Sequence, residues 1–128
     1  MLTMKGRLAN LIKGSDAESR AAKLLRRKGY KIVEKNKSYK FGELDIIAEK
    51  GSQRIFVEVK FRSNQTFGDA SEFVDAAKQR RLIKAALSWI QLQDPQMHFS
   101  YRFDVIAIQD RSGVQEINWI ENAFEASF

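Results

Sequence analysis

Two apolar segments joined by a short turn restrict the fold of this chain more than any other feature. Residues 42–49, GELDIIAE, and residues 54–60, RIFVEVK, both have the pattern of strands, and KGSQ joins them. A turn centred on Gly51 and Ser52 makes them an antiparallel hairpin. Because a slip of one residue would move every side chain to the opposite face, the apolar pattern predicts a single register.

In that register the hairpin has one apolar face and one mixed face. The apolar face is expected to carry the cross-strand pairs Leu44–Val59, Ile46–Val57 and Ala48–Ile55. The mixed face is expected to carry Glu43–Lys60, Asp45–Glu58, Ile47–Phe56 and Glu49–Arg54. Two of these mixed pairs join opposite charges, whereas the pair of Asp45 and Glu58 joins like charges.

Two acids placed opposite each other are destabilising, so Asp45 and Glu58 require a positive partner. One interpretation is a solvated face on which water, Lys60 and Arg62 balance the acids. The other is a divalent cation, since magnesium prefers hard oxygen ligands and binds through one or two carboxylates. The neighbouring apolar pair of Ile47 and Phe56 shows that the face is not simply solvated, but the pattern alone leaves both interpretations open.

The rest of the chain predicts helices on either side of this hairpin. We expect a helix over residues 15–28, a strand over 30–36, a polar loop over 61–70, a helix over 71–93, and strands over 100–108 and 114–120. The first three strands can form an antiparallel meander, and the fourth, after a helical crossover, can join in parallel. The predicted fold class is mixed α/β (α+β), with helices flanking one sheet.

The chain length of 128 residues fits one domain, with residues 1–13 as a loosely attached segment that can add a short amphipathic helix. On the first helix, Ser15 and Glu18 have the spacing of a capping box, which we favour. Alternatively Glu18, at helical spacing from Ala21, Ala22 and Leu25, points toward the protein body. The second helix is expected to bury a stripe of five residues: Phe73, Ala76, Ile83, Leu87 and Ile90.

Composition narrows the function classes. The chain has no cysteine and one histidine, His98, which excludes a thiolate zinc site, a cysteine nucleophile and a multi-histidine metal site. No apolar run approaches the roughly 18 residues of a transmembrane helix, so we expect a cytoplasmic protein without a membrane partner. The formal net charge of +6 favours a polyanionic partner, although the signal is modest.

Several other residues have both a functional and a structural interpretation. Basic clusters at residues 26–28 and at Lys78, Arg80, Arg81 and Lys84 either contact phosphate or form solvated helix faces. Asp104 interrupts an apolar strand, and we favour a structural role over a catalytic one, through pairing with Arg102 or with a helix terminus. Trp89 and Trp119 are expected in the core or an interface.

An ordered set of motifs then identifies a family resemblance. The motifs are Gly14 to Glu18 with Ala22, "N…FGELDII" (36–47), "FVEVKFR" (56–62), "FG" (67–68), Lys78, "RFDV" (102–105) and "IENAF" (120–124). On these the chain resembles the YraN-like family of uncharacterised bacterial proteins, within the restriction-endonuclease-like, or PD-(D/E)XK, nuclease superfamily. The resemblance covers residues from about 14 to 124, and Leu44 stands where the superfamily motif has proline.

The resemblance implies a central mixed sheet flanked by helices and a metal-dependent nuclease site. It implies that Asp45 and Glu58 bind Mg²⁺, or Mn²⁺ as a substitute, with Glu18 as a further metal ligand. It implies that Lys60 positions or activates the attacking water. Candidate nucleic-acid contacts are Arg62, Lys78, Gln79 and Arg81. Resolvase-like members generally act as dimers, so the resemblance also implies a homodimer.

From these observations we expect a magnesium-dependent endonuclease acting on nucleic acid, DNA in the first instance, with branched or damaged DNA as candidate substrates. The alternatives are a nucleic-acid-binding module that does not cut and a protein–protein adaptor with a nuclease-like fold.

Overall fold

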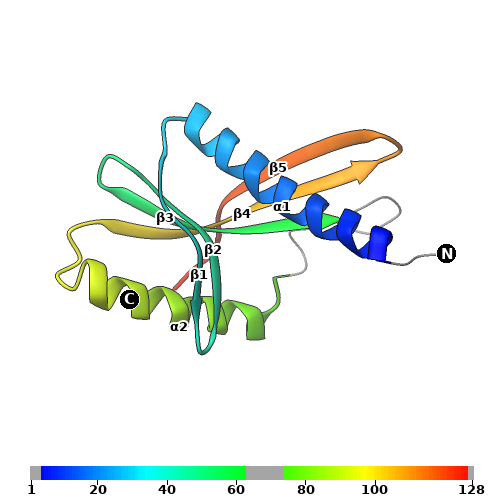
Figure 1. Ribbon diagram of the computed structural model, residues 1–128. Coiled ribbons are helices and arrows are strands. Elements are labelled where there is room, and N and C mark those ends of the chain that lie inside the picture. The colour runs from blue at the N-terminus through cyan, green and yellow to red at the C-terminus, as the bar shows by residue number, and fades with distance from the viewer. Residues whose placement is uncertain (1–3, 63–73, 127–128) are drawn as a thin grey trace.

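A five-stranded mixed sheet lies between two helices, as Figure 1 shows. The computed structural model describes the backbone of residues 4–62 and 74–126, and the side chains from residue 16 onward within these ranges. In chain order the elements are α1 (Met4–Arg27), β1 (Lys31–Tyr39), β2 (Gly42–Lys50), β3 (Gln53–Arg62), α2 (Ala76–Gln93), β4 (Ser100–Arg111) and β5 (Val114–Phe124). No helix in the described ranges is long and apolar enough to cross a membrane.

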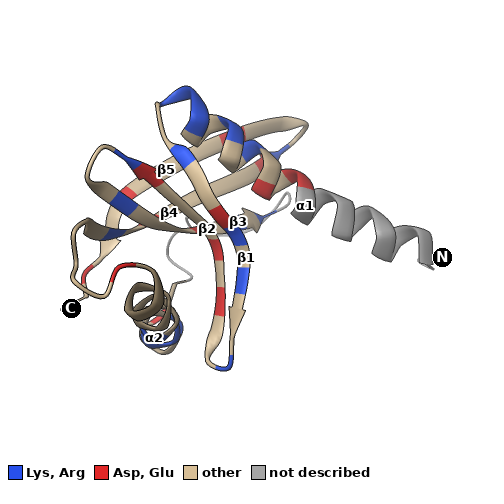
Figure 2. Cartoon of the chain, turned by 60° about the vertical axis from the view of Figure 1, so that its left-hand side comes forward, with Lys and Arg blue, Asp and Glu red and all other residues tan. Residues whose placement is uncertain are grey.

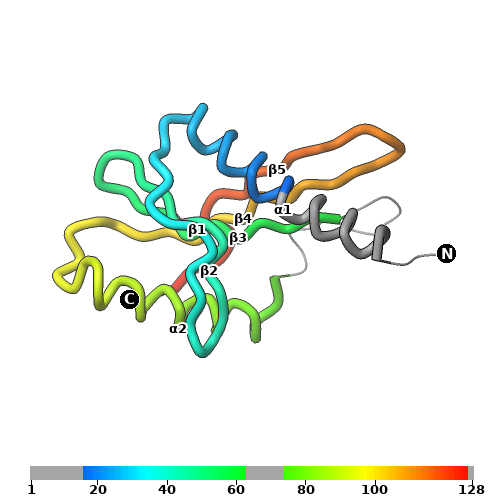
Figure 3. Tube along the Cα trace, viewed as in Figure 1, coloured from blue at the N-terminus to red at the C-terminus, as the bar shows by residue number. Residues whose placement is uncertain are grey.

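The strands follow one another across the sheet in the order β1-β2-β3-β4-β5. The first three form the expected antiparallel meander, β4 joins β3 in parallel after the α2 crossover, and β5 pairs antiparallel with β4. The mixed α/β class is therefore confirmed. Figure 3 shows the same course as a continuous tube, with the two helices on opposite sides of the sheet.

The β2–β3 register is confirmed near the turn, where Ile46 faces Val57 and Ala48 faces Ile55. Regular pairing of the two strands ends at Ile46 and Val57. Beyond this point the first residues of β2 pair only with β1, whereas β3 continues beside β4 as far as Arg62. The two strands thus diverge, and we call this divergence the strand fork.

Three predicted cross-strand pairs fall beyond the last ladder pair, so none of them forms as a regular pair. Glu43 lies opposite Ser38 and accepts a hydrogen bond from its hydroxyl at 3.1 Å, so the expected pairing with Lys60 is wrong. Leu44 packs in the α2-side core rather than with Ile46 on the α1 side. The predicted pairing register therefore holds only in the part of the hairpin where β2 and β3 remain adjacent.

Each face of the sheet has its own apolar core. The α1-side core contains Ala17, Ala21, Ala22, Leu25, Ile46, Ala48, Ile55, Val57, Ile106 and Ile108. The α2-side core contains Leu44, Ile47, Phe56, Val74, Leu82, Ala85, Ala86, Trp89, Ile90, Phe103, Val105 and Phe124. Because the central strands are apolar on both faces, they read as nearly continuous hydrophobic runs.

Both helices differ from the sequence expectation in detail. α1 begins at Met4, so Ser15 lies inside the helix and the predicted capping box is wrong. α2 begins at Ala76 after the N-cap Asp75, whose carboxylate accepts the Lys78 N–H at 2.7 Å. Its buried face is Leu82, Ala85, Ala86, Trp89 and Ile90. Ala76 is exposed, Ile83 and Leu87 are only partly buried, and Phe73 lies outside the described residues.

The predicted polar loop overlaps the segment 63–73, which lies outside the described residues, while Phe61 and Arg62 still belong to β3. The strand predicted over residues 114–120 continues to Phe124 through a bulge opposite Phe103 and Val105.

Candidate active site at the strand fork

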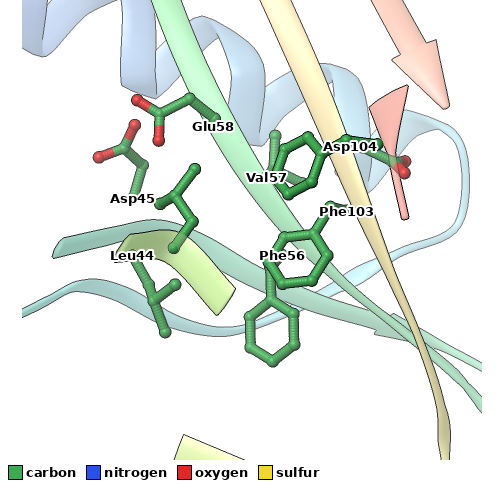
Figure 4. Close-up of a pocket in the computed structure, with 9 residues that line it drawn as sticks. Leu44, Asp45, Phe56, Val57, Glu58, Phe103 and Asp104 are labelled. Atoms are coloured by element: carbon green, nitrogen blue, oxygen red, sulfur yellow. The ribbon is translucent and has the colours of Figure 1, made fainter. Parts of the chain in front are cut away.

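Asp45 and Glu58 meet at the strand fork. Asp45 comes from β2 just beyond the last ladder pair, and its Oδ2 accepts a hydrogen bond from the Val59 N–H at 2.9 Å. A side chain thus satisfies a backbone donor that the separating strands leave without a backbone partner on that side. Figure 4 shows the carboxylates of Asp45 and Glu58 turned toward one another. The sequence-predicted acid pair is therefore brought together, by the divergence of the strands rather than by regular pairing.

Burial and mutual repulsion make this pair hard to ionise. Burial, followed by the negative charge of Glu58, raises the pKa of Asp45 to about 7, against the lowering effect of the Val59 hydrogen bond. Burial also raises the pKa of Glu58, which is only 7% exposed, although the positive charges of Lys78 and Lys60 oppose this shift. At neutral pH the two carboxyl groups therefore resist carrying two full charges together.

Lys78 forms an ion pair with Glu58. Its Nζ lies 3.6 Å from Glu58 Oε1, and its position in the first turn of α2 is fixed by the N-cap at Asp75. The other carboxylate oxygen, Glu58 Oε2, is buried and has no hydrogen-bond partner among the described residues. A buried acceptor without a donor is costly, so this oxygen favours a bound cation or a proton.

The acid pair fits a hard divalent cation. Two carboxylates from adjacent strands converge, and one buried oxygen is unsatisfied. An added positive charge would offset the burial that raises both pKa values and the negative charge of Glu58 that raises the pKa of Asp45 further. The floor of the site is a cavity of about 10 Å³, roughly the space of one water molecule. It is lined mainly by Leu44, Phe56, Leu82, Phe103 and Phe124. A substrate must therefore approach the carboxylates from the surface rather than enter this cavity.

Glu18 lies on the partly buried side of α1, and its charge contributes to raising the pKa of Asp45. The charge of Glu18 therefore acts on the acid pair, which agrees with the alternative prediction that Glu18 points toward the protein body and not with the capping box. Within residues whose side chains are described, no group of three or more potential metal ligands is found. The role of Glu18 as a third ligand stays a prediction.

Lys60 is partly buried on β3, two residues beyond Glu58, and its charge lowers the pKa of that carboxyl. In the ladder it lies opposite Ala107 of β4. Lys60 is therefore an electrostatic neighbour of the acid pair, as the charges on the mixed face predicted, and its part in activating water, which the resemblance implies, stays a prediction.

The candidate nucleic-acid residues separate into different positions. Lys78 contacts the acid pair, and Arg81 is exposed on α2 above the start of β2, where its Cβ lies 3.6 Å from the position of a Cβ built on Gly42. Gln79 instead donates its side-chain amide to the Val74 carbonyl at 3.0 Å and so holds the helix start. Arg62 ends β3 opposite Gln109. Lys78 was predicted to contact phosphate, and the sequence pattern does not reveal its ion pair with Glu58, which joins a helix to a strand twenty residues away.

Asp104 lines the same cavity, but its carboxylate points away from the pair in Figure 4. It receives two hydrogen bonds from Arg102, at 2.7 and 2.8 Å, and one each from the Trp119 indole and the Asn122 N–H. The structural interpretation of Asp104 is confirmed, because the carboxylate is completely buried and its hydrogen bonds hold the bulge of β5. Trp89 is likewise a core residue, with its indole donating to Glu34 at 3.0 Å.

Fold and site together define a class of protein: a mixed α/β domain with a buried carboxylate pair at the fork between two central strands. Comparison with known proteins gives the family. Residues 17–108 match the model of the uncharacterised protein family UPF0102, and the chain belongs to this family. The family recognised from the motifs is thereby confirmed.

Relatives that match over most of their own length carry the same family name. A UPF0102 protein of Vibrio parahaemolyticus is 46% identical over 110 residues, which cover 86% of this chain and 89% of the relative. UPF0102 proteins of Shewanella loihica and Nitrosomonas eutropha are each 43% identical, over 90% and 88% of this chain and 96% and 93% of their own lengths.

Proposed function

We propose that this protein is a magnesium-dependent endonuclease that hydrolyses phosphodiester bonds in nucleic acid. The observation that carries the proposal is the convergence of Asp45 and Glu58 at the strand fork, with a buried Glu58 oxygen that lacks a hydrogen-bond donor among the described residues. The resemblance to restriction-endonuclease-like nucleases, which rests on the same residues, supports this proposal.

Asp45 and Glu58 would hold the cation, with Glu18 as a candidate third ligand. When bound, magnesium supplies charge neutralisation at the phosphoryl group and lowers the pKa of a water molecule. The Val59 N–H holds Asp45 in place at 2.9 Å, so the carboxylate needs little reorganisation. Lys60 adds positive charge beside Glu58 and would offset charge that develops on the phosphate.

Lys78 would have a double role in this scheme. In the structure it neutralises Glu58 at 3.6 Å, while about a third of its side chain, 34%, remains exposed. Its ammonium can therefore turn from the carboxylate to a substrate phosphate, since both are anionic oxygen groups. This keeps a cation at the fork before and after substrate binds.

Cleavage of labelled nucleic acids tests the proposal. Linear, flapped and four-way DNA, together with single-stranded and duplex RNA, would be incubated with magnesium, manganese or EDTA. We expect metal-dependent cleavage by the wild type and none by Asp45→Asn or Glu58→Gln, while Glu125→Gln, which changes an exposed acid just after β5, retains activity.

The same substrates separate the alternatives. A gel shift without cleavage would refute the nuclease proposal and favour a nucleic-acid-binding module. The shift should weaken as salt is added, because phosphate contacts make affinity fall steeply with salt. Neither cleavage nor a gel shift on any substrate would refute the proposal and favour a protein–protein adaptor.

A further inference from the structure

An exposed aromatic ring lies at the tip of the β1–β2 hairpin, beside α2. The tip connects Tyr39 to Gly42, and Phe41 is 42% exposed. The Lys84 Nζ lies 5.7 Å from the centre of its ring, and Arg81 covers the adjacent Gly42. Figures 1 and 2 both place the hairpin tip next to α2. We call Lys40, Phe41, Arg81 and Lys84 the tip patch.

The tip patch is strongly basic. Lys40, Arg81 and Lys84 are exposed, and no ion pair to an acid is found for any of them within the described part of the chain. Figure 2 shows basic positions both at the hairpin tip and along α2. Three positive charges around an exposed ring suit a partner that has both phosphates and flat apolar surfaces.

The patch is continuous with the acid pair along α2. Lys78 contacts Glu58, Arg81 follows three residues later above the start of β2, and Lys84 follows three residues after that beside Phe41. Residues at this spacing form an oblique ridge on a helix. At about 1.5 Å per residue, Lys78 and Lys84 are separated by about 9 Å along the helix axis. At about 3.4 Å per nucleotide of a stacked strand, this corresponds to two to three nucleotides.

We infer that the tip patch binds an unpaired base and its flanking phosphates, with Phe41 stacking on the base. The inference rests on the proposed function and refines its substrate class to nucleic acid with a single-stranded or splayed region about two to three nucleotides from the bond at the acid pair. A paired base in continuous duplex has both faces stacked on its neighbours, so it offers no face to Phe41. DNA and RNA share this chemistry.

Binding without metal isolates the patch from catalysis. Fluorescence anisotropy in EDTA would measure the affinity of the full chain for single-stranded DNA, single-stranded RNA and a matched duplex. Phe41→Ala should weaken binding of the single strands by about tenfold or more and leave duplex binding unchanged. Phe41→Trp should bind the single strands as tightly as the wild type does. It should also add tryptophan emission that is quenched when a single strand binds. Whichever single strand, DNA or RNA, binds with the higher affinity identifies the type of nucleic acid that the patch prefers.

Matched control variants remove an exposed apolar side chain or a lysine charge outside the tip patch. Leu92→Ala deletes another exposed apolar side chain of α2, at 74% exposure, and should leave affinity unchanged. Lys84→Gln should lower the slope of log affinity against log salt by about one, whereas Lys23→Gln, an exposed lysine on α1 across the sheet, should not.

The outcomes separate this inference from the proposed function. Equal single-strand affinity of Phe41→Ala and Leu92→Ala would overturn the inference, even if the wild type cleaves DNA with magnesium. Phe41-dependent binding without cleavage in magnesium would support the patch and refute the nuclease. Absence of binding to every strand in EDTA would overturn the inference, whereas the proposed function is overturned only if cleavage with magnesium is absent as well.

Discussion

Replacing Asp45 by asparagine should stabilise the metal-free protein at neutral and higher pH. The pKa of Asp45 is raised from 3.8 to about 7 by burial and by Glu58, so the folded chain holds a proton that the unfolded chain has released. The stability of the wild type relative to Asp45→Asn therefore falls as pH rises from about 4 to about 7, and the difference is constant above that. Asparagine keeps the carbonyl that accepts the Val59 N–H and adds a donor for Glu58.

The magnitude follows from the same pKa. A difference of about three pKa units corresponds to on the order of 4 kcal/mol at high pH, which is the upper limit. Asp45 keeps some contact with solvent and shares the repulsion with Glu58, so we expect about 2 kcal/mol, or about 6–10 °C in Tm for a chain of this size.

Thermal unfolding between about pH 4 and pH 8 in EDTA measures this difference, with Glu125→Gln as the exposed-acid control. Saturating manganese should then raise the Tm of the wild type and leave that of Asp45→Asn unchanged, because only the wild type offers both carboxylates. The reasoning is refuted if Asp45→Asn is no more stable than the wild type at about pH 8, or if their difference does not change with pH.

Two further variants test the neighbourhood of the pair. Asp104→Ala should cost about 3–5 kcal/mol in urea unfolding, because the partly buried Arg102 guanidinium, the Trp119 indole and the Asn122 N–H lose their buried acceptor. A loss under about 1 kcal/mol would contradict the role assigned to Asp104. Lys78→Gln should move the titration of the two carboxyl groups to higher pH, because it removes the cation beside Glu58; carbon-13 NMR follows this titration. Lys84→Gln should not move it. An unchanged titration in Lys78→Gln would mean that the ion pair with Glu58 does not form in solution.

The sequence predicts the element order and the hairpin register well, because both depend on the alternation of apolar residues near one turn. Only the observed register places four apolar side chains on the same face of the hairpin: Ile46, Ala48, Ile55 and Val57. The meeting of Asp45 and Glu58 is predicted because they are the next residues beyond the last pair of that register, although the divergence of the strands, rather than regular pairing, brings their carboxylates together.

The divergence of the strands could not be predicted from pairing rules. Leu44 continues the apolar alternation, but it packs on the α2 side because β2 separates from β3 after Ile46. Nothing local in the sequence distinguishes a strand that continues beside its neighbour from one that turns away. For this reason Glu43 pairs with Ser38, and the role of the Val59 N–H was not foreseen.

The helices show how a local signal can give way to the surrounding structure. Ser15 and Glu18 have capping-box spacing, yet the helix extends back to Met4 and leaves the motif in its interior. On α2, Ile90 of the predicted stripe is buried as expected, whereas Ile83 and Leu87 lie beside the observed buried face, because Trp89 and Leu82 fill the space there. Lone apolar positions do not specify which side of a short helix meets the sheet.

The most direct test of the whole account is a crystal structure of the wild type grown with manganese and collected at its absorption edge. We predict an anomalous peak between Asp45 and Glu58, with metal–oxygen distances of about 2.0–2.3 Å to both carboxylates and Lys78 turned away from Glu58. A fork without an anomalous peak, in crystals soaked to saturation and with both carboxylates placed as described, would contradict the metal site and with it the proposed nuclease.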